Sequence, residues 1–583
     1  MAAAYLGVEH SLTGRRWVGP SADEDRLAEA MAQGIGLPGP LARMLVKRGV
    51  PPQEAEPFLA PSLRDLLPDP RRLKDMQKAA ARINSAVEAS EHVAVFADYD
   101  VDGGSSAALL IRWFRHFGMA ATLYVPDRIE EGYGPNAPAI GELAARHSLI
   151  ICVDCGTLSH EALAAAEGRA DVLVLDHHLG GETLPPALAV VNPNRQDESG
   201  ELGHLCAAAV VFLALVEANR QMRGTGRAPL PDLMTLLDLV ALATVADVAP
   251  LIGVNRALVR QGLRVMAHRA HPGLAALADV AGMDRAPTSY HLGYLLGPRI
   301  NAGGRVGKAD LGARLLATDD TAEAQALAER LDALNHERRE IEAQVQEGAM
   351  AQAEARGVEA PLVWAAGEGW HPGVVGIVAS RLKEATNRPA VVIGLEDGHG
   401  KGSGRSVAGV DLGAAVHRLQ AEGLIERGGG HKMAAGLSLS EAQLEPAMER
   451  LSDLLARQGA GASGPRDLRL DGMLLPTAAT VELIEQLELA GPFGASARAP
   501  RFALPEVAIA DARVVGDGHL KLSIRTAMGH RLDAIGFRLA DGPLGKALLE
   551  HRGGAFHLAG RLEVNSWQGR QRPQLRLEDA SPV

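Results

Sequence analysis

Residues 91 to 200 alternate short apolar runs with helical segments, and this alternation constrains the fold more than any other feature of the sequence. The runs are rich in Val, Ile and Leu, and the segments between them are rich in Ala and Leu. Strands that alternate with helices in this way predict a parallel, doubly wound α/β sheet. The predicted strands are Val93–Phe96, Ala121–Val125, Leu149–Val153 and Val172–Leu175.

The turn after the first predicted strand carries three aspartates, Asp98, Asp100 and Asp102, followed by Gly103 and Gly104. In extended backbone this spacing points all three carboxylates to one side. Three like charges at this spacing repel one another, and carboxylate oxygens suit a neutralising Mg²⁺ or Mn²⁺ ion. The two glycines allow a tight turn into a helix. The motif predicts a metal site, with an acidic surface turn as the alternative.

Two more strand ends and one helix end carry further acids. Asp154 ends the third predicted strand, and Asp176, His177 and His178 end the fourth. Ligands of doubly wound sheets bind beyond the carboxyl ends of the strands, which is where these side chains lie. One histidine is a candidate ligand through its neutral imidazole, and the other is a candidate to orient a ligand or contact substrate. Asp247 follows an apolar helix, and its expected partner is the metal centre, with a helix-end salt bridge as the alternative.

Three glycine-rich segments that contain cations predict contacts with phosphate. We expect residues 297–308 to form a loop in which Arg299 and Arg305 face phosphate oxygens, because arginine forks match them. Residues 400–406 and 428–436 are predicted loops of a second α/β lobe. Each of the two loops of the second lobe has a flexible turn as its alternative interpretation.

Composition limits the class of protein. A chain of 583 residues with 47% hydrophobic and 22% charged residues is too long for one core and typical of a globular protein. The net charge of −12 argues against coating DNA through bulk charge, but it leaves room for a local basic groove. No apolar run reaches the roughly 18 residues of a membrane span, and we expect no secretory signal. Three cysteines give no disulfide framework, so we expect a cytoplasmic protein.

The C-terminal domain is predicted to be a small antiparallel β-barrel. With 15 Lys and Arg against 14 Asp and Glu, it is the least acidic part of the chain. Trp567 lies among Arg570 and Arg572, a combination typical of single-strand binding, with a plain β-domain as the alternative. The expected domains are an N-terminal helical cap (1–90), a catalytic α/β domain (91–318), a connecting helix (319–357), a second α/β lobe (358–458) and the barrel (466–583).

Several motifs, in order, resemble known families. Asp98–Gly103, Val153–Gly156, Asp176–His178 and Ala246–Val248 resemble the DHH phosphoesterase superfamily, and Gly428–His431 is similar to its DHHA1 second lobe. Four further segments narrow the resemblance to the RecJ family of single-strand-specific exonucleases. These segments are Gly297–Arg305, Gly369–Gly376, Lys401–Ser406 and the tryptophan-containing C-terminal segment.

The resemblance implies a 5′→3′ exodeoxyribonuclease that acts on single-stranded DNA in recombination and repair, by two-metal-ion hydrolysis with Mn²⁺ or Mg²⁺. It also implies an OB-like barrel and a monomer without membrane contact, with a single-stranded-DNA-binding protein and a helicase as candidate partners. The alternatives are a DHH-type phosphodiesterase of short oligonucleotides or cyclic dinucleotides, and a non-catalytic DNA-binding scaffold.

The resemblance also assigns roles to individual residues. The implied metal ligands are Asp98, Asp100, Asp102, Asp154, His177 and Asp247, and the catalytic set is Asp100, Asp102, Asp154, His177, His178 and Asp247. The implied substrate-binding residues are Arg128, Arg299, Asn301, Arg305, Ser403, Arg405 and His431, and those that bind nucleic acid in the barrel are Trp567, Arg570 and Arg572.

Overall fold

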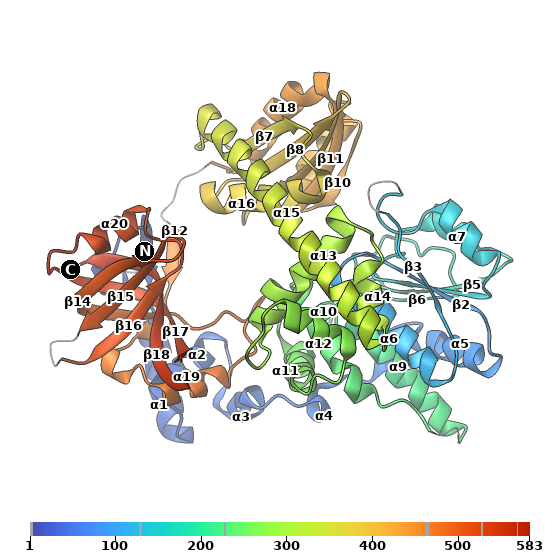
Figure 1. The fold of residues 1–583 in the computed structure, drawn as a ribbon, viewed down its shortest axis with the longest axis horizontal. Helices are drawn as coiled ribbons and strands as arrows, with labels where there is room; N and C mark the ends of the chain where they lie inside the picture. Colours follow the sequence, from blue (N-terminus) through green and yellow to red (C-terminus); the bar gives the residue numbers. More distant parts are fainter. Residues whose placement is uncertain (1–3, 128–130, 227–228, 462–465, 526–528, 568) are drawn as a thin grey trace. The chain divides into compact units, whose positions relative to one another are not determined.

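The computed structural model describes residues 4–127, 131–226, 229–461, 466–525, 529–567 and 569–583, and only the backbone of Arg466 and Trp567. The chain divides into two compact units (Figure 1). The larger unit comprises Pro68–Ala249 and Gln261–Ser463, and the smaller unit comprises Met1–Leu67, Pro250–Arg260 and Gly464–Val583.

The first sheet of the larger unit has five strands, all parallel, in the order β3-β2-β4-β5-β6. Every residue of β2 and β4 is buried, because the strands are apolar at each position and helices pack against the sheet. The predicted doubly wound α/β fold is therefore confirmed. The strands are β2 (Val93–Ala97), β3 (Thr122–Tyr124), β4 (Leu149–Val153), β5 (Asp171–Leu175) and β6 (Ala189–Val191), and the helices are η3 (Pro70–Arg72), α5 (Met76–Glu88), α6 (Val101–His116), α7 (Ala137–Ala144), α8 (His160–Ala164) and α9 (Ala207–Gly224).

A helical region follows the sheet and ends in the predicted long helix, α15, which packs on α12 and α13 at one end and on α16 and β7 at the other (Figure 1). The predicted glycine-rich loop at 297–308 is wrong, because residues 297–306 form helix α13. The helices are η4 (Leu233–Leu236), α10 (Leu237–Ala246), α11 (Gly253–Ala267), α12 (Pro272–Val280), η5, a π-helix (His291–Leu296), α13 (Gly297–Val306), α14 (Leu311–Ala317) and α15 (Thr321–Arg356).

The second sheet of the larger unit has the order β10-β11-β9-β8-β7, with β7 and β8 parallel and the other pairs antiparallel. The two predicted loops of this lobe are wrong, because residues 399–405 form one strand and residues 427–431 and 434–440 form two more. Gly400, Gly402 and Gly404 alternate along β9, and a Cβ on each would lie 3.0 Å or less from a side chain of the core. The elements are β7 (Val363–Glu368), α16 (Pro372–Thr386), β8 (Ala390–Glu396), β9 (His399–Arg405), α17 (Leu412–Ala421), β10 (Arg427–His431), β11 (Ala434–Ser440), η6 (Glu441–Gln443) and α18 (Leu444–Ala456).

The smaller unit contains the C-terminal barrel. Strands β14, β15, β16, β18 and β17 pair in that order, and β14 also pairs with β17, so the sheet closes. Its pairs are antiparallel except for the parallel pair β16–β18. The elements are β12 (Arg466–Arg469), β13 (Gly472–Met473), η7 (Pro476–Ala478), α19 (Val481–Glu488), β14 (Phe502–Val515), β15 (His519–Arg525), β16 (Arg531–Gly536), α20 (Pro543–Leu549), β17 (Ala555–Trp567) and β18 (Arg570–Pro582).

The N-terminal segment belongs to the barrel rather than to the α/β domain that it was predicted to cap. Strand β1 pairs with β12, and the buried Trp17 indole donates a hydrogen bond to Asp579 at 2.9 Å. Within the larger unit, η3 and α5 pack against α9 of the α/β domain, and α5 also packs against β6. Among the helices of the described residues, none combines the length and apolarity needed to cross a bilayer. The remaining elements are η1 (Tyr5–Gly7), β1 (Arg15–Val18), α1 (Ala22–Ile35), α2 (Gly39–Lys47), η2 (Pro52–Glu54), α3 (Ala55–Leu59) and α4 (Leu63–Leu66).

Candidate metal centre

The first acidic motif is divided between the end of β2 and the start of α6. Asp100 caps α6, because its Oδ1 accepts hydrogen bonds from the amides of Asp102 and Gly103 at 2.9 and 3.0 Å. A Cβ on Gly103 would lie 2.4 Å from the Asp98 carbonyl oxygen, so glycine is required in this turn, as predicted. The extended backbone expected for all three aspartates stops at Asp100, where the helix begins.

The acidic and histidine side chains predicted from the strand ends meet in one cluster. They form three overlapping groups, and in each group one oxygen or nitrogen atom per residue lies within 4.8 Å of the others. Asp154 and His177 each belong to two groups. The three groups are Asp98, Asp100 and Asp154; Asp102, His177 and Asp247; and Asp154, His177 and His178.

Asp102 is buried against the first turn of α9. Its Oδ2 and Oδ1 accept hydrogen bonds from the amides of Ala207 and Ala208 at 2.7 and 2.8 Å. A helix N-terminus stabilises a carboxylate, so the start of α9 favours the ionised form of this side chain. Burial nevertheless raises the pKa of Asp102, with His177 opposing the shift and Asp100 adding to it.

Asp154 is a buried acid with one carboxylate oxygen that has no hydrogen-bond donor among the described residues. It follows β4 with a left-handed φ of 59° and is 2% exposed. Its Oδ1 lies 3.2 Å from His177 Nε2 but accepts no hydrogen bond from any residue that the structure describes. Burial, followed by the charges of Asp102 and Asp100, raises the pKa of Asp154 well above its usual range.

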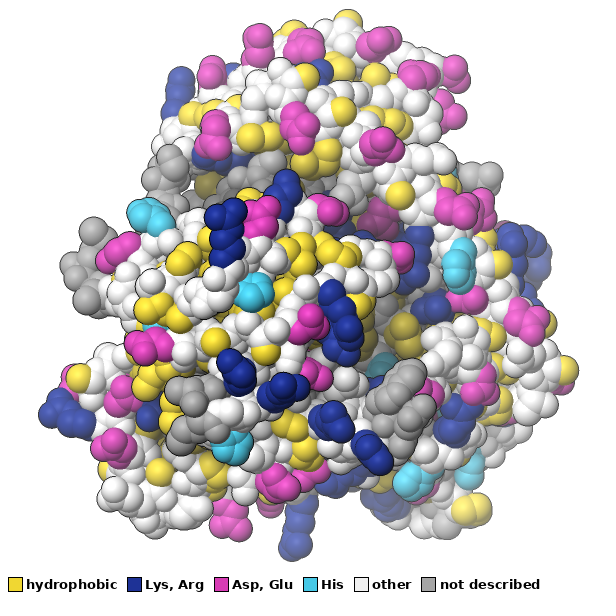
Figure 2. Space-filling view, turned by 60° about the vertical axis from the view of Figure 1, so that its left-hand side comes forward, with side chains coloured by type: hydrophobic (Ala, Val, Ile, Leu, Met, Phe, Trp, Pro, Cys, Tyr) yellow, Lys and Arg dark blue, Asp and Glu magenta, His cyan; other side chains and the backbone are white. Residues whose placement is uncertain are grey.

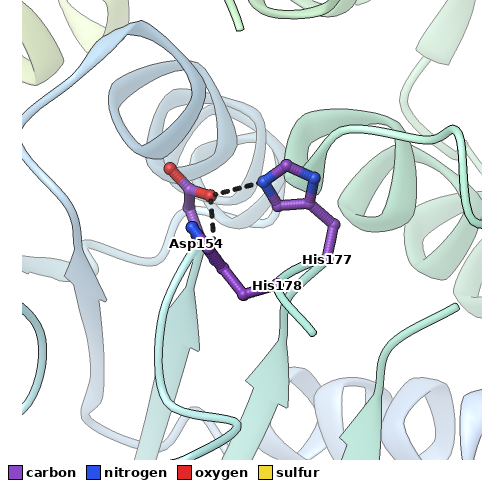
Figure 3. A group of neighbouring side chains, drawn as sticks. All are labelled: Asp154, His177 and His178. Carbon is purple, nitrogen blue, oxygen red and sulfur yellow. Dashed lines mark ion pairs between the residues drawn. The ribbon is translucent and has the colours of Figure 1, made fainter. Parts of the chain in front are cut away.

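The two histidines after β5 have different partners. Figure 3 shows the Asp154 carboxylate and the His177 imidazole turned toward one another. The other ring nitrogen of His177, Nδ1, lies 3.8 Å from Asp247. His178 Nδ1 lies 2.8 Å from Asp176, and its Nε2 lies 3.1 Å from the Tyr133 hydroxyl. Burial lowers the pKa of His178, but Asp176 outweighs burial and raises it to about 9.

Asp176 is not one of the candidate ligands, because its oxygens are already occupied. One oxygen accepts hydrogen bonds from the amide and hydroxyl of Thr157, and the other accepts them from the amides of His177 and His178. Although burial opposes it, hydrogen bonding to His178 and Thr157 holds the pKa of Asp176 below its usual range. This aspartate therefore fixes the loop that carries both histidines.

Asp247 completes the cluster from the C-terminal end of α10. Burial, followed by the charges of Asp102 and Asp100, raises its pKa to about 8. The next residue, Val248, has a left-handed φ of 59° and a side chain that is 69% exposed. A β-branched residue adopts this conformation only under strain, so the turn after Asp247 is determined by its surroundings.

The cluster has the composition of a divalent-cation site. The pKa values of Asp102, Asp154 and Asp247 are raised, and Asp154 Oδ1 is a buried acceptor without a donor among the described residues. Carboxylate oxygens combined with imidazole nitrogens suit ions such as Mn²⁺. Because Asp154 and His177 each take part in two groups, the residues fit a pair of neighbouring ions.

A cavity of about 540 Å³ brings together four of the predicted substrate-binding residues, Arg305, Ser403, Arg405 and His431. Lys401, Ser403 and Arg405 alternate with the glycines of β9 and therefore share one face of the strand. Arg305 Nη1 donates a hydrogen bond to the Gly373 carbonyl of α16, which joins α13 to the second lobe. The side chains of Tyr133 and Lys401 also line the cavity.

Two other predicted substrate-binding residues have structural partners instead. The guanidinium of Arg299 is buried, with Nε 2.8 Å from Asp332 Oδ1 and Nη1 donating to the Leu295 carbonyl. Asn301 Oδ1 accepts a hydrogen bond from the Val101 amide at 3.0 Å, so Asn301 positions the start of α6. Arg299 and Asn301 therefore have structural roles in α13. In a helix these side chains contact neighbouring elements, whereas in the expected loop they would face solvent.

In the barrel, Arg570 and Arg572 line a second cavity, of about 440 Å³, together with Lys521, Asn565 and Gln574. Figure 2 shows Lys and Arg side chains gathered in the middle and lower part of the face that comes forward there, with acidic side chains among them. The Trp567 side chain and Arg128, both predicted to contact substrate, lie outside the described residues.

Two residues that line the cavity of the second lobe, Tyr133 and Lys401, were not predicted from the sequence. Tyr133 lies between Gly132 and Gly134, which both have positive φ, and an aromatic residue between two such glycines is a signal of an exposed side chain. Lys401 precedes Ser403 and Arg405 at the spacing of two that places alternate residues of a strand on one face. The signal was hidden by the expectation of a loop.

Known families match three parts of the chain. The DHH family, N-terminal domain, matches residues 92–244, the DHHA1 domain matches residues 359–457, and the RecJ OB domain matches residues 470–579. The two sheets of the larger unit and the acidic cluster thus define a DHH-type phosphoesterase with a DHHA1 lobe.

Comparisons over most of the chain identify a family within this class of phosphoesterases. The single-stranded-DNA-specific exonuclease RecJ of Dickeya dadantii is 38% identical over 94% of this chain and 96% of its own length. The RecJ of Escherichia coli is 35% identical over 94% of this chain and 96% of its own length. A crystal structure of Thermus thermophilus RecJ in complex with Mn²⁺ is 31% identical, covers 97% of this chain and 79% of that one, and has a TM-score of 0.79. The chain belongs to the RecJ family.

Proposed function

We propose that this chain is a metal-dependent exonuclease that hydrolyses single-stranded DNA from its 5′ end, in DNA recombination and repair. The observation that carries the proposal is the buried cluster around Asp154, whose Oδ1 lacks a donor among the described residues. The proposal is supported by the relatives, which are named single-stranded-DNA-specific exonucleases.

The proposed metal ligands are the carboxylates and the imidazole that form the cluster. Two Mn²⁺ or Mg²⁺ ions bound there would supply a water of lowered pKa and stabilise charge on the scissile phosphate. His178 lies at the edge of the cluster with a raised pKa, so its protonated form is available to a phosphate oxygen. The proposed ligands are Asp98, Asp100, Asp102, Asp154, His177 and Asp247.

The cavity of the second lobe is the proposed site of the 5′-terminal nucleotide. Arg305, Arg405 and His431 offer donors to phosphate, and Ser403 adds a hydroxyl beside Arg405 Nη1 at 2.9 Å. Tyr133 lines the same cavity and lies next to His178, so the cavity reaches the edge of the metal cluster. A strand whose 5′ end is held in the cavity would therefore present its phosphates to the cluster.

The barrel is the proposed holder of the longer strand. Arg570 and Arg572 lie with Lys521 around one cavity, which suits backbone phosphates, and Trp567 remains a predicted stacking residue. The protein partners proposed are a single-stranded-DNA-binding protein and a helicase, since both handle the single strands that this enzyme would digest. We place a monomeric enzyme in the cytoplasm, where its three buried free cysteines stay reduced.

The test is digestion of long single-stranded DNA labelled at either end, with Mn²⁺, with Mg²⁺ and with EDTA. We expect the 5′ label to be released first, only with metal, and duplex DNA of the same sequence to be spared. Asp102→Ala is expected to remove activity by at least about 10³-fold, as loss of a metal ligand does, whereas Glu161→Gln on exposed α8 keeps it. Release that starts at the 3′ end, or digestion of short oligonucleotides alone, would contradict the proposal.

A further inference from the structure

Two exposed tyrosines stack on one another at the start of the helical segment that leads into α13. The ring centroids of Tyr290 and Tyr294 are 5.2 Å apart, with 25° between the ring planes. Their side chains are 55% and 68% exposed, although tyrosines with that much apolar surface usually pack. This pair is the stacked tyrosine platform to which the rest of the inference refers.

Buried side chains of its own helical segment hold the platform in place. Leu292 and Leu296 lie on the opposite side and are fully buried, so the segment cannot rotate to hide the tyrosines. Residues 291–296 form the π-helix η5, a rare geometry that is frequently found at functional sites. Residues four apart are neighbours on a helix surface, and this places the two rings face to face.

The same segment is fixed to two elements of the metal cluster. Gly293 and Gly297 lie against Val245 and Ala246, the two residues that precede Asp247, since a Cβ on either glycine would contact them at 3.4 Å. Further along, Asn301 holds the start of α6. The platform is therefore attached rigidly to the helix that delivers Asp247.

Within the cluster, Asp247 and His178 belong to different groups of candidate ligands: Asp247 lies with Asp102, His178 lies with Asp154, and His177 belongs to both groups. His177 stands between them, with Nε2 toward Asp154 and Nδ1 toward Asp247. His178 adjoins Tyr133 and the cavity proposed for the 5′-terminal nucleotide. A strand that enters that cavity by its 5′ end would thus leave the cluster on the side of Asp247.

We propose that Tyr290 and Tyr294 stack on bases of the single strand that lie beyond the first nucleotide on the 3′ side of the scissile phosphate. The inference rests on the proposed function. Stacking uses the faces of bases, which are available in a single strand and hidden in a duplex, and it tolerates any sequence. The platform would hold the strand between successive cleavages, so its loss should weaken binding of long strands more than it slows hydrolysis.

The test compares the Tyr290→Ala/Tyr294→Ala variant with the Tyr290→Phe/Tyr294→Phe variant, which keeps both aromatic faces. Steady-state rates are measured with Mn²⁺ on a long 5′-phosphorylated strand and on a 5′-phosphorylated dinucleotide. For the long strand, we expect the alanine variant to raise KM about tenfold or more, while kcat changes less than twofold. Both variants should cleave the dinucleotide as the wild type does, which also shows that they are folded.

An abasic scan identifies the bases involved. Strands with one abasic site, moved stepwise from the 5′ end, are bound to the wild type and the alanine variant with Ca²⁺ in place of Mn²⁺. We expect one or two positions near the 5′ end where the missing base weakens wild-type binding and has no effect on the alanine variant. An unchanged KM in the alanine variant, an equal loss in the phenylalanine variant, or abasic effects that persist without the tyrosines would overturn the inference. Failure of the proposed function would differ, since the wild type itself would then release no nucleotide with Mn²⁺.

Discussion

Asp154 and Asp176 follow neighbouring strands and are both buried, yet their surroundings give them opposite roles. Asp176 receives hydrogen bonds on both oxygens, and its pKa lies below its usual range. Asp154 Oδ1 has no donor among the described residues, and the pKa of Asp154 is raised by burial and by Asp102. A buried charge without a partner is costly, so Asp154 is arranged for a cation and Asp176 for the loop.

This difference predicts opposite effects of the two isosteric substitutions on stability. Without metal at pH 8, Asp154→Asn should raise the free energy of unfolding by about 1 kcal/mol or more, because it removes the cost of burying or protonating the acid. Asp176→Asn should lower it by about 1.5–3 kcal/mol, because charge-assisted hydrogen bonds are lost. Urea unfolding of metal-free protein measures both. Equal destabilisation by the two substitutions would contradict the assignment.

The raised pKa of Asp247, about 8, predicts that metal affinity depends on pH. Below pH 8 the metal-free carboxyl holds a proton that a cation must displace, so apparent affinity should rise from pH 6 to pH 8 and then level off. The folded pKa lies above the unfolded one, so the carboxyl costs metal-free stability as pH rises toward 8, and the metal removes that cost. The increase in Tm caused by Mn²⁺ should therefore be larger at pH 8 than at pH 6. An equal increase at the two pH values would refute this reasoning.

At the scale of elements, the packing around helix α13 explains its glycines. They let large side chains of neighbouring elements approach the helix, a role that the expectation of a loop did not include. A Cβ on Gly304 would lie 2.0 Å from the ring of Tyr99, and one on Gly307 would lie 2.5 Å from Leu334. Tyr99 lies between Asp98 and Asp100, so the packing of α13 positions the first acidic motif.

Gly304→Ala should therefore disturb the metal cluster without touching it. The added methyl displaces Tyr99, and we expect a loss of about 1–3 kcal/mol in stability and a weaker response to Mn²⁺. Gly293→Ala in the preceding turn is the matched control, because its Cβ meets Val245 at an ordinary 3.4 Å. Thermal unfolding with and without Mn²⁺ distinguishes the two variants. If Gly304→Ala responded to the metal as the wild type does, Tyr99 would not connect α13 to the cluster.

At the scale of the whole molecule, the chain ends meet in the smaller unit. The amide of Leu12 donates to the Ala580 carbonyl, and Trp17 is completely buried beside Asp579. A fragment that begins at residue 464 would therefore contain the barrel but lack the N-terminal strand that packs with it.

Asp579→Ala is expected to release the N-terminal segment from the barrel. The substitution leaves the Trp17 indole without its acceptor and should destabilise the smaller unit by about 1–3 kcal/mol. Asp467→Ala, which removes only the partly exposed ion pair with Arg16, should cost under about 1 kcal/mol. Limited proteolysis and tryptophan fluorescence during urea unfolding report the difference. Similar behaviour of the two variants would show that the buried hydrogen bond does not hold the segment.

Most of the site could be read from local patterns. Apolar runs ended at acids, and the ends of parallel strands share one edge of a sheet, so Asp98, Asp154 and His177 were expected to meet there. The glycine-rich segments were misread, because glycine gives the same signal in a loop, in β9 and in α13. The need for glycine follows only from large side chains that come from elsewhere in the chain. Ile393 packs against two of the glycines of β9, and Tyr99 packs against a glycine of α13.

The sequence by itself determined the alternation of strands and helices, the acids at the strand ends and the family to which the chain belongs, because periodicity and motif order are local properties. Tertiary structure alone decided that Arg299 is paired with Asp332 whereas Arg305 reaches a cavity, although both lie on α13. It also decided that Asp154 Oδ1 has no donor among the described residues, whereas both oxygens of Asp176 accept hydrogen bonds. The physical reason is that burial and partners come from residues far away in the sequence, and they determine which charges are already satisfied.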